Sequence, residues 1–267
     1  MAPVRASTAT VNGITLTYSD SGGDGPAVVL SHGYLMDSSM FDPQVAALAP
    51  EYRVITWDER GHGGTRATEP FSYWDSASDV LGLLDHLGIE QAVLGGMSQG
   101  GFLSMRAAML APQRVRALIL IDTQAGLEDP AAVPAYEEME RIWREQGPEP
   151  VRDIVASIIL GPPDGTVDYA PWFDKWDAVD RETMGHAFRC LIDRDDITGR
   201  IGEITCPVLI LHGTADAAIP MAKAEVLQAG FPGPATLVQV EGGSHAANLS
   251  NPDQVNVAML EFLRSLP

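Results

Sequence analysis

Short apolar runs recur along the chain and predict buried strands. Six such runs lack polar alternation: Ala27–Leu30, Arg53–Trp57, Gln91–Leu94, Ala117–Ile121, Val208–Leu211 and Ala235–Val238. Strands of this kind are buried on both faces, as in a parallel sheet covered by helices. Upstream of them, Asn12-Gly13 separates short segments in which apolar and polar positions alternate, which predicts a β-hairpin.

Helical patterns lie between the predicted strands. The stretch Gly101–Ala111 is rich in helix formers and stops before a proline. In the last predicted helix, Asn251 is the expected capping residue, Pro252 suits the first position, and apolar residues follow at i, i+3, i+4 and i+7 from Val255. This alternation predicts an α/β fold with a mainly parallel central sheet flanked by helices.

One long stretch breaks the alternation. Between residues 124 and 202 the pattern predicts helices and no strand; the helical segments are Ala135–Gln146, Val151–Leu160 and Arg181–Ile192. Gly-Pro pairs separate them. We interpret residues 124–202 as a helical cap inserted into one core domain, whose two parts are residues 1–123 and 203–267.

Composition narrows the classes of function. The 267 residues carry a net charge of −19, which would repel a phosphate backbone and argues against a nucleic-acid partner. The two cysteines, Cys190 and Cys206, are too few for a disulfide scaffold. The N-terminal residues lack a signal-peptide pattern, and no apolar run approaches 18 residues. We therefore expect a cytoplasmic protein without a membrane partner; its oligomeric state is left open.

A candidate nucleophile lies in Gly96-Met97-Ser98-Gln99-Gly100, which fits the pattern G-x-S-x-G. The pattern is short, so its context decides. It follows a predicted strand and opens a predicted helix. Glycines two residues before and after the serine leave room for a sharp, strained turn that exposes the hydroxyl.

Serine needs a base, and the base needs an orienting group. Asp216 follows the predicted strand that ends at Leu211, and His245 follows the one that begins at Ala235. Ser98, Asp216 and His245 therefore all lie beyond the carboxyl ends of strands, where open α/β sheets place their sites. Asp122 ends another strand.

Together these segments resemble the α/β-hydrolase superfamily, in the branch of esterases, enol-lactonases and cofactor-free haloperoxidases. The resemblance also makes Asp122 an alternative position for the acid, because some members of the superfamily carry their acid there. The segments that carry the resemblance are Ser31–Tyr34, Asp58–Gly63, Gly96–Gly100, Leu211–Asp216 and Gly243–His245. The resemblance covers nearly the whole chain and implies the α/β-hydrolase fold with a helical cap. It also implies an oxyanion hole formed by the backbone N–H groups of Tyr34 and Gln99.

The remaining histidines have less specific roles. His32 and His62 belong to the quoted segments, and we expect them to hold loops by hydrogen bonding. No cluster has metal-ligand spacing and no G-x-G-x-x-G follows a strand, so neither a metal nor a cofactor is expected. In the cap, Trp143, Trp172 and Trp176 are candidates for an apolar pocket over Ser98.

These observations predict a serine hydrolase that cleaves a carboxylic ester or lactone of a small, largely apolar substrate through an acyl-enzyme. The same triad would also serve a perhydrolase or haloperoxidase-like reaction, or hydrolysis of a C–C bond. A receptor that binds a small molecule without turnover is a further alternative.

Overall fold

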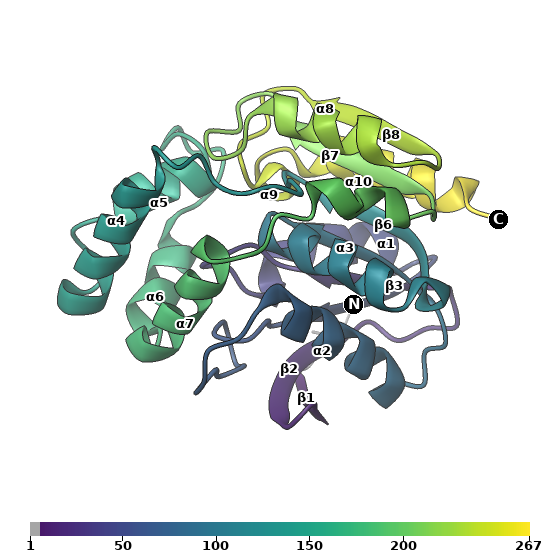
Figure 1. Ribbon diagram of the computed structural model, residues 1–267, viewed down its shortest axis with the longest axis horizontal. Helices are drawn as coiled ribbons and strands as arrows, with labels where there is room; N and C mark the ends of the chain where they lie inside the picture. Colours follow the sequence, from purple (N-terminus) through teal and green to yellow (C-terminus); the bar gives the residue numbers. More distant parts are fainter. Residues whose placement is uncertain (1–5) are drawn as a thin grey trace.

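The computed structural model describes residues 6–267, and its eight strands form one sheet in the order β1-β2-β4-β3-β5-β6-β7-β8 (Figure 1). The strands are β1 (Ser7–Val11), β2 (Ile14–Asp20), β3 (Ala27–Ser31), β4 (Arg53–Trp57), β5 (Ala92–Met97), β6 (Val115–Ile121), β7 (Val208–Gly213) and β8 (Ala235–Val240). The pairs β1–β2 and β2–β4 are antiparallel, and every other pair is parallel. The mainly parallel sheet predicted from the apolar runs is therefore confirmed.

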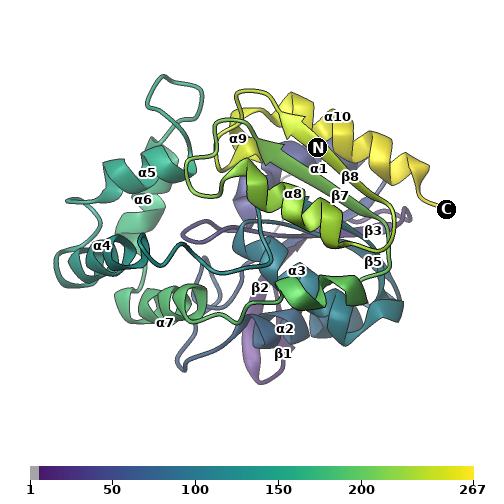
Figure 2. The ribbon, with the colours of Figure 1, turned by 45° about the horizontal axis from the view of Figure 1, so that its top comes forward.

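Helices cover both faces of the sheet (Figure 2). One face carries α2 (Tyr73–His86), α3 (Gln99–Leu110) and α8 (Met221–Gly230), whereas the other carries α1 (Asp42–Leu48) and α10 (Pro252–Ser265). Neighbouring residues such as Val93 and Leu94 belong to different cores, because successive strand side chains point to opposite faces. The shorter helices are η1 (Ser38–Phe41), η2 (Pro112–Arg114), η3 (Thr198–Glu203) and α9 (Ala247–Ser250).

Four helices stand together between β6 and β7, at the left of Figure 1. They are α4 (Val133–Gln146), α5 (Arg152–Ile159), α6 (Ala170–Ala178) and α7 (Arg181–Ile192). Three of them match the predicted helices to within two residues. The helix α6 was not predicted, because its nine residues are stabilised by the packing of Trp172 and Trp176 and not by a strong local pattern.

The last helix corrects one detail of the sequence prediction. Pro252 occupies its first position, but the side chain of Asn251 makes no capping hydrogen bond to the helix. Its amide instead donates to the carbonyl of Glu241 at 3.1 Å, and its carbonyl oxygen accepts from the Ser250 hydroxyl at 2.7 Å. Asn251 therefore ties the start of α10 to the loop that follows β8.

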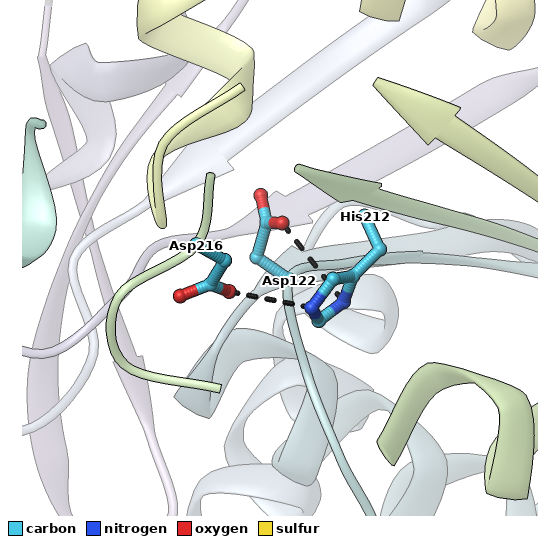
Figure 3. Close-up of side chains that lie close together, drawn as sticks. All are labelled: Asp122, His212 and Asp216. Atoms are coloured by element: carbon cyan, nitrogen blue, oxygen red, sulfur yellow. Dashed lines mark ion pairs between the residues drawn. The ribbon is translucent and has the colours of Figure 1, made fainter. Parts of the chain in front are cut away.

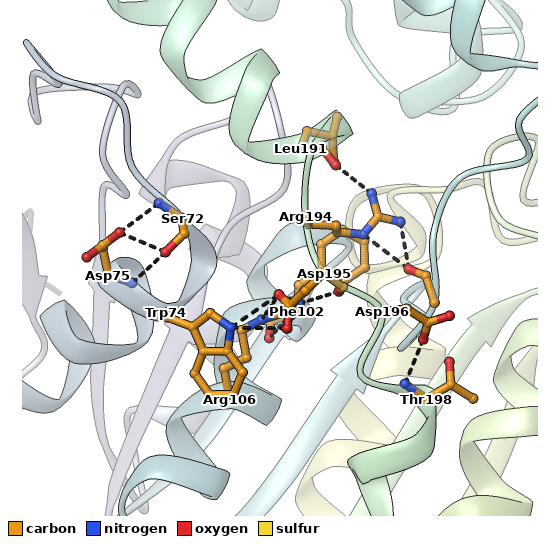
Figure 4. A network of polar contacts seen from close by, with 11 residues as sticks. Ser72, Trp74, Asp75, Phe102, Arg106, Leu191, Arg194, Asp195, Asp196 and Thr198 are labelled. Atoms are coloured by element: carbon orange, nitrogen blue, oxygen red, sulfur yellow. Dashed lines mark hydrogen bonds and ion pairs between the residues drawn. The ribbon is translucent and has the colours of Figure 1, made fainter.

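The helices α4, α5, α6 and α7 are called the cap helices below. The two chain segments that join them to the sheet are fastened to each other (Figure 4). Arg194, on the returning segment, donates to the carbonyl of Gly126 on the outgoing segment at 2.9 Å, and its guanidinium lies over the Phe102 ring. Next to it, the buried Arg106 of α3 pairs with Asp195 at 2.6 Å. The returning segment is thus anchored directly to α3, and the outgoing segment is held to it through Arg194.

No helix within residues 6–267 is long and apolar enough to cross a membrane. Cys190 and Cys206 are free thiols, the first buried and the second half-buried.

Candidate active site

Ser98 occupies a sharp turn between the last residue of β5 and the first residue of α3. Its backbone lies at φ 51° and ψ −114°, a conformation that residues with a side chain rarely adopt. The turn is held from both sides: the Ser98 N–H donates to the carbonyl of Ile121 at 2.9 Å, and its carbonyl accepts from the Thr123 hydroxyl at 2.7 Å. Neighbouring strand β6 therefore maintains the strained serine.

Two glycines allow this turn, as the sequence pattern predicts. A Cβ on Gly96 would lie 2.2 Å from the carbonyl carbon of Gly100, and a Cβ on Gly100 would lie 1.9 Å from the carbonyl oxygen of Ser31. Neither distance is possible for a real side chain. The first turn of α3 therefore packs directly against the backbone of β5 and the end of β3.

His245 and Asp216 are in direct contact. Nδ1–H of His245 donates to Oδ2 of Asp216 at 2.9 Å, and the other carboxylate oxygen accepts the N–H groups of Ala218 and Ile219 at 2.8 and 2.9 Å. Burial of Asp216 opposes its ionisation, but His245 and these N–H donors outweigh burial and lower its pKa. With Nδ1 protonated, Nε2 of His245 is left as the proton acceptor.

Ser98 and His245 line the same cavity, which has a volume of about 130 Å³. They reach it from different strands: Ser98 follows β5, Asp216 follows β7 and His245 follows β8. Because β5, β6, β7 and β8 are parallel neighbours, their carboxyl ends meet at one edge of the sheet. The structure thus gathers the three residues that the sequence places far apart.

Asp122, the alternative acid, lies beside Asp216 but has different hydrogen-bond partners (Figure 3). Its two oxygens accept the backbone N–H groups of Gly213 at 2.7 Å and Ala247 at 3.1 Å, and it makes no hydrogen bond to His245. Burial, and after it the negative charge of Asp216, raise its pKa well above the ordinary value. Asp122 therefore links the last residue of β7, just before the loop of Asp216, to the first residue of α9, just after the loop of His245.

Asp122, His212 and Asp216 are also the group whose ligand atoms, all within 4.8 Å of one another, could hold a metal ion. Most of their polar atoms already have partners in the protein: each carboxylate accepts backbone N–H groups, and Nε2 of His212 lies 2.8 Å from the carbonyl oxygen of Ile219. Nδ1 of His212 is buried and has no hydrogen-bond partner among the described residues. Hydrogen bonding within the protein accounts for their proximity.

The loop after β3 carries Tyr34, whose side chain lines the cavity. The N–H groups of Tyr34 and Gln99 donate no hydrogen bond to any residue of the described part of the chain. His32 fastens this loop, as predicted: its Nδ1–H donates to the carbonyl of Gly33 at 2.8 Å, and its Nε2 accepts from the N–H of Glu59 at 2.9 Å.

Only one of the three candidate tryptophans lies in the cavity wall. Trp143 lines it together with apolar cap residues such as Ile158, Met184 and Phe188. Trp172 and Trp176 do not, which corrects the prediction.

The reason is the direction in which α6 packs. The indole N–H of Trp176 donates to the carbonyl of Leu35 at 2.7 Å, and Lys175 lies over the Trp172 ring while it binds Asp37 at 2.8 Å. The helix therefore supports the loop after Tyr34, and its tryptophans do not face Ser98.

The sequence pattern indicates no role for Glu59, although the residue lies in Asp58–Gly63, one of the segments that carry the family resemblance. Glu59 is fully buried, and its Oε2 accepts from the side-chain amide of Gln99 at 2.6 Å, while the Tyr73 hydroxyl donates to the carbonyl oxygen of that amide at 3.1 Å. Burial raises the pKa of Glu59 from its ordinary value of 4.5 to about 8. Glu59 contacts the side chain of Gln99, the residue next to the candidate nucleophile. A local sequence pattern cannot indicate this contact, because the two residues are 40 positions apart.

Comparison with known proteins agrees with the fold and the motifs. Residues 26–252 match the model of the alpha/beta hydrolase fold family. The chain belongs to this family. A 3-oxoadipate enol-lactonase of Acinetobacter baylyi is 28% identical to this α/β hydrolase, over 94% of each chain.

Two solved structures are also similar to the α/β hydrolase. The enol-lactonase from Burkholderia xenovorans has a TM-score of 0.88 at 29% identity, covering 97% of this chain and all of the other. A thermophilic esterase from Thermogutta terrifontis has a TM-score of 0.88 at 26% identity, covering 98% and 99%. These relatives support a hydrolase function for the chain.

Replacement of Gly100 by alanine should destabilise the α/β hydrolase. The new Cβ would force α3 away from β3, and overpacking of this kind costs about 2–4 kcal/mol. Urea unfolding measures the loss. Gly199→Ala, where a Cβ would meet nothing within 4 Å, is the matched control. Equal stability of the two variants would contradict the close approach described above.

Glu59→Gln should change how stability depends on pH. Because the folded-state pKa of Glu59 is raised to about 8, the folded protein holds a proton that the unfolded chain releases, so Glu59 lowers stability as pH rises from about 5 to 8. Glutamine does not titrate and removes this slope. Relative to the wild type, Glu59→Gln should therefore raise the free energy of unfolding by on the order of 1–3 kcal/mol more at pH 8 than at pH 5.

Urea unfolding at both pH values, with the exposed Glu69→Gln as a charge-matched control, tests this expectation. The same pH dependence in Glu59→Gln and the wild type would refute it.

Proposed function

We propose that this α/β hydrolase cleaves a carboxylic ester or lactone of a small, largely apolar substrate through an acyl-enzyme on Ser98. The observation that carries the proposal is the arrangement around one cavity. Ser98 lies at a strained turn in its wall, and His245 lies in the same wall with Nδ1 held by Asp216. The names of the enol-lactonase and esterase relatives support this substrate class.

In the proposed reaction Ser98 attacks the substrate carbonyl while Nε2 of His245 takes the hydroxyl proton. His245 then gives the proton to the leaving alkoxide as the tetrahedral intermediate collapses to the acyl-enzyme. A water molecule, deprotonated by the same nitrogen, then attacks the acyl-enzyme. As the ester bond to Ser98 breaks and the acid is released, His245 returns that proton to the Ser98 oxygen. Asp216 fixes the tautomer of His245 and stabilises the charged form of His245. The lowered pKa of Asp216 favours the negative carboxylate that this role requires.

The tetrahedral intermediates place a negative charge on the former carbonyl oxygen. We assign the N–H groups of Tyr34 and Gln99 as its donors, since both are free of other partners in the described chain and Gln99 begins α3. Glu59 would help to position this oxyanion hole, because its carboxyl group accepts a hydrogen bond from the side-chain amide of Gln99. The loop that carries Tyr34 is in turn braced by Trp176.

Ser98→Ala should lower kcat for a p-nitrophenyl ester by several orders of magnitude while the melting temperature stays within a few degrees of the wild type. The exposed Ser78→Ala is the matched control and should keep full activity. A phosphonate ester should label wild-type Ser98 with a stoichiometry of one. Esterase activity retained by Ser98→Ala would overturn the proposed nucleophile, and labelling without any turnover would indicate a receptor.

The cavity also predicts a limit on acyl length. At about 130 Å³ it is close to the ~150 Å³ cavity that encloses benzene in another protein, so kcat/KM should be highest for chains of about four to six carbons. Trp143→Ala should move the optimum to longer chains, because it removes a wall residue, whereas Trp172→Phe should leave the profile unchanged. A series of p-nitrophenyl esters measures both; coincident profiles for Trp143→Ala and wild type would exclude Trp143 as a determinant.

A further inference from the structure

Two glutamates and, among the described residues, no lysine or arginine line the cavity. The carboxylates belong to Glu128 and Glu140, and the other lining residues are apolar apart from Ser98, His245 and two tyrosines. An acidic wall without a cation is an unfavourable place for an anionic substrate group. Whether this charge acts on a substrate depends on how each carboxylate is paired.

Glu128 is neutralised from within the protein. Its Oε1 lies 2.8 Å from Nη2 of Arg194, whose side chain is 2% exposed. The same guanidinium donates to the carbonyls of Gly126 and Leu191, so it is held in place behind the wall. This buried pair presents little net charge to the cavity.

Glu140 is paired more weakly. Its side chain is 13% exposed, whereas its partner Arg144, at 3.2 Å, is 53% exposed on the outer side of α4. Solvent screens an exposed partner of this kind, so the pair is only partly compensated. The carboxylate acts across the cavity wall: after burial, Glu140 is the next cause of the raised pKa of Tyr34.

We propose that Glu140 is a specificity-determining residue that makes this site accept neutral esters or lactones and reject those that bear a second, free carboxylate. The inference rests on the proposed function, since it concerns the same cavity. Two negative charges about 8 Å apart at an effective dielectric constant of about 20 disfavour each other by roughly 30-fold. No cation in the wall offsets this repulsion.

A pair of substrates of equal size isolates the charge. One is the mono-p-nitrophenyl ester of glutaric acid, and the other is the p-nitrophenyl ester of glutaramic acid, in which a neutral amide replaces the carboxylate. The measured quantity is the ratio of kcat/KM for the amide to kcat/KM for the acid, corrected for spontaneous hydrolysis. In the wild type we expect a ratio of about 30 or more.

Three variants assign the effect to its residue. Glu140→Gln should lower the ratio by about 30-fold, to near one, and Arg144→Gln, which leaves Glu140 without its partner, should raise it. Glu137→Gln removes a charge from the same helix at a residue that is 49% exposed and outside the cavity wall, so it should not change the ratio.

The possible results separate this inference from the proposed function. A wild-type ratio near one, or a ratio that Glu140→Gln leaves unchanged, would overturn the inference while hydrolysis of the amide ester still upheld the esterase. A ratio lowered equally by Glu140→Gln and Glu137→Gln would assign the effect to the net charge of the chain and also overturn it. Absence of Ser98-dependent hydrolysis of both esters would overturn the proposed function and the inference together.

Discussion

The direct packing of the first turn of α3 against the backbone of β5 and β3 is the constraint on which the rest of the site depends. No side chain separates these backbones at Gly96 and Gly100, and the turn between them forces Ser98 into a conformation that costs on the order of 1–3 kcal/mol. This conformation persists because the Ser98 N–H donates to the carbonyl of Ile121 in β6 and the hydroxyl of Thr123, just after β6, donates to the Ser98 carbonyl. The same packing places the first N–H groups of α3 beside the serine.

Three buried carboxyl groups near this turn show how environment differentiates one kind of side chain. Asp216 has His245 and two N–H donors, and its pKa is lowered in spite of burial. Asp122 and Glu59 are buried with too little compensation, and their pKa values are raised. The surroundings therefore favour the charged form of the carboxylate at Asp216, beside His245, and disfavour it at Asp122 and Glu59. Asp122 and Glu59 serve as braces, one between the end of β7 and the start of α9 and one for Gln99.

The cap helices complete the site without supplying its three polar residues. Arg106 and Arg194 anchor the returning segment to α3, the helix that begins next to Ser98, and Arg194 also holds the outgoing segment at Gly126. The helices α4 and α5 contribute cavity wall, whereas α6 braces the loop of Tyr34 through Trp176. Ser98, Asp216 and His245 thus follow strands at one edge of the sheet, whereas α4 and α5 contribute mostly apolar wall to the same cavity.

The sequence by itself determined the mainly parallel sheet, several of the helices, though not α6, and the candidate residues Ser98, Asp216 and His245. Apolar runs, glycine spacing and position after a strand are local properties, and parallel strands bring such positions to a common edge. Only the tertiary structure decided that Asp216 and not Asp122 contacts His245, and that Trp143 alone of the three tryptophans faces the cavity. The burial of Glu59 and the exposure of Glu140 to the cavity also depend on how distant elements pack. A side chain's direction and charged state are set by partners that lie far away in the sequence, and no local pattern specifies those partners.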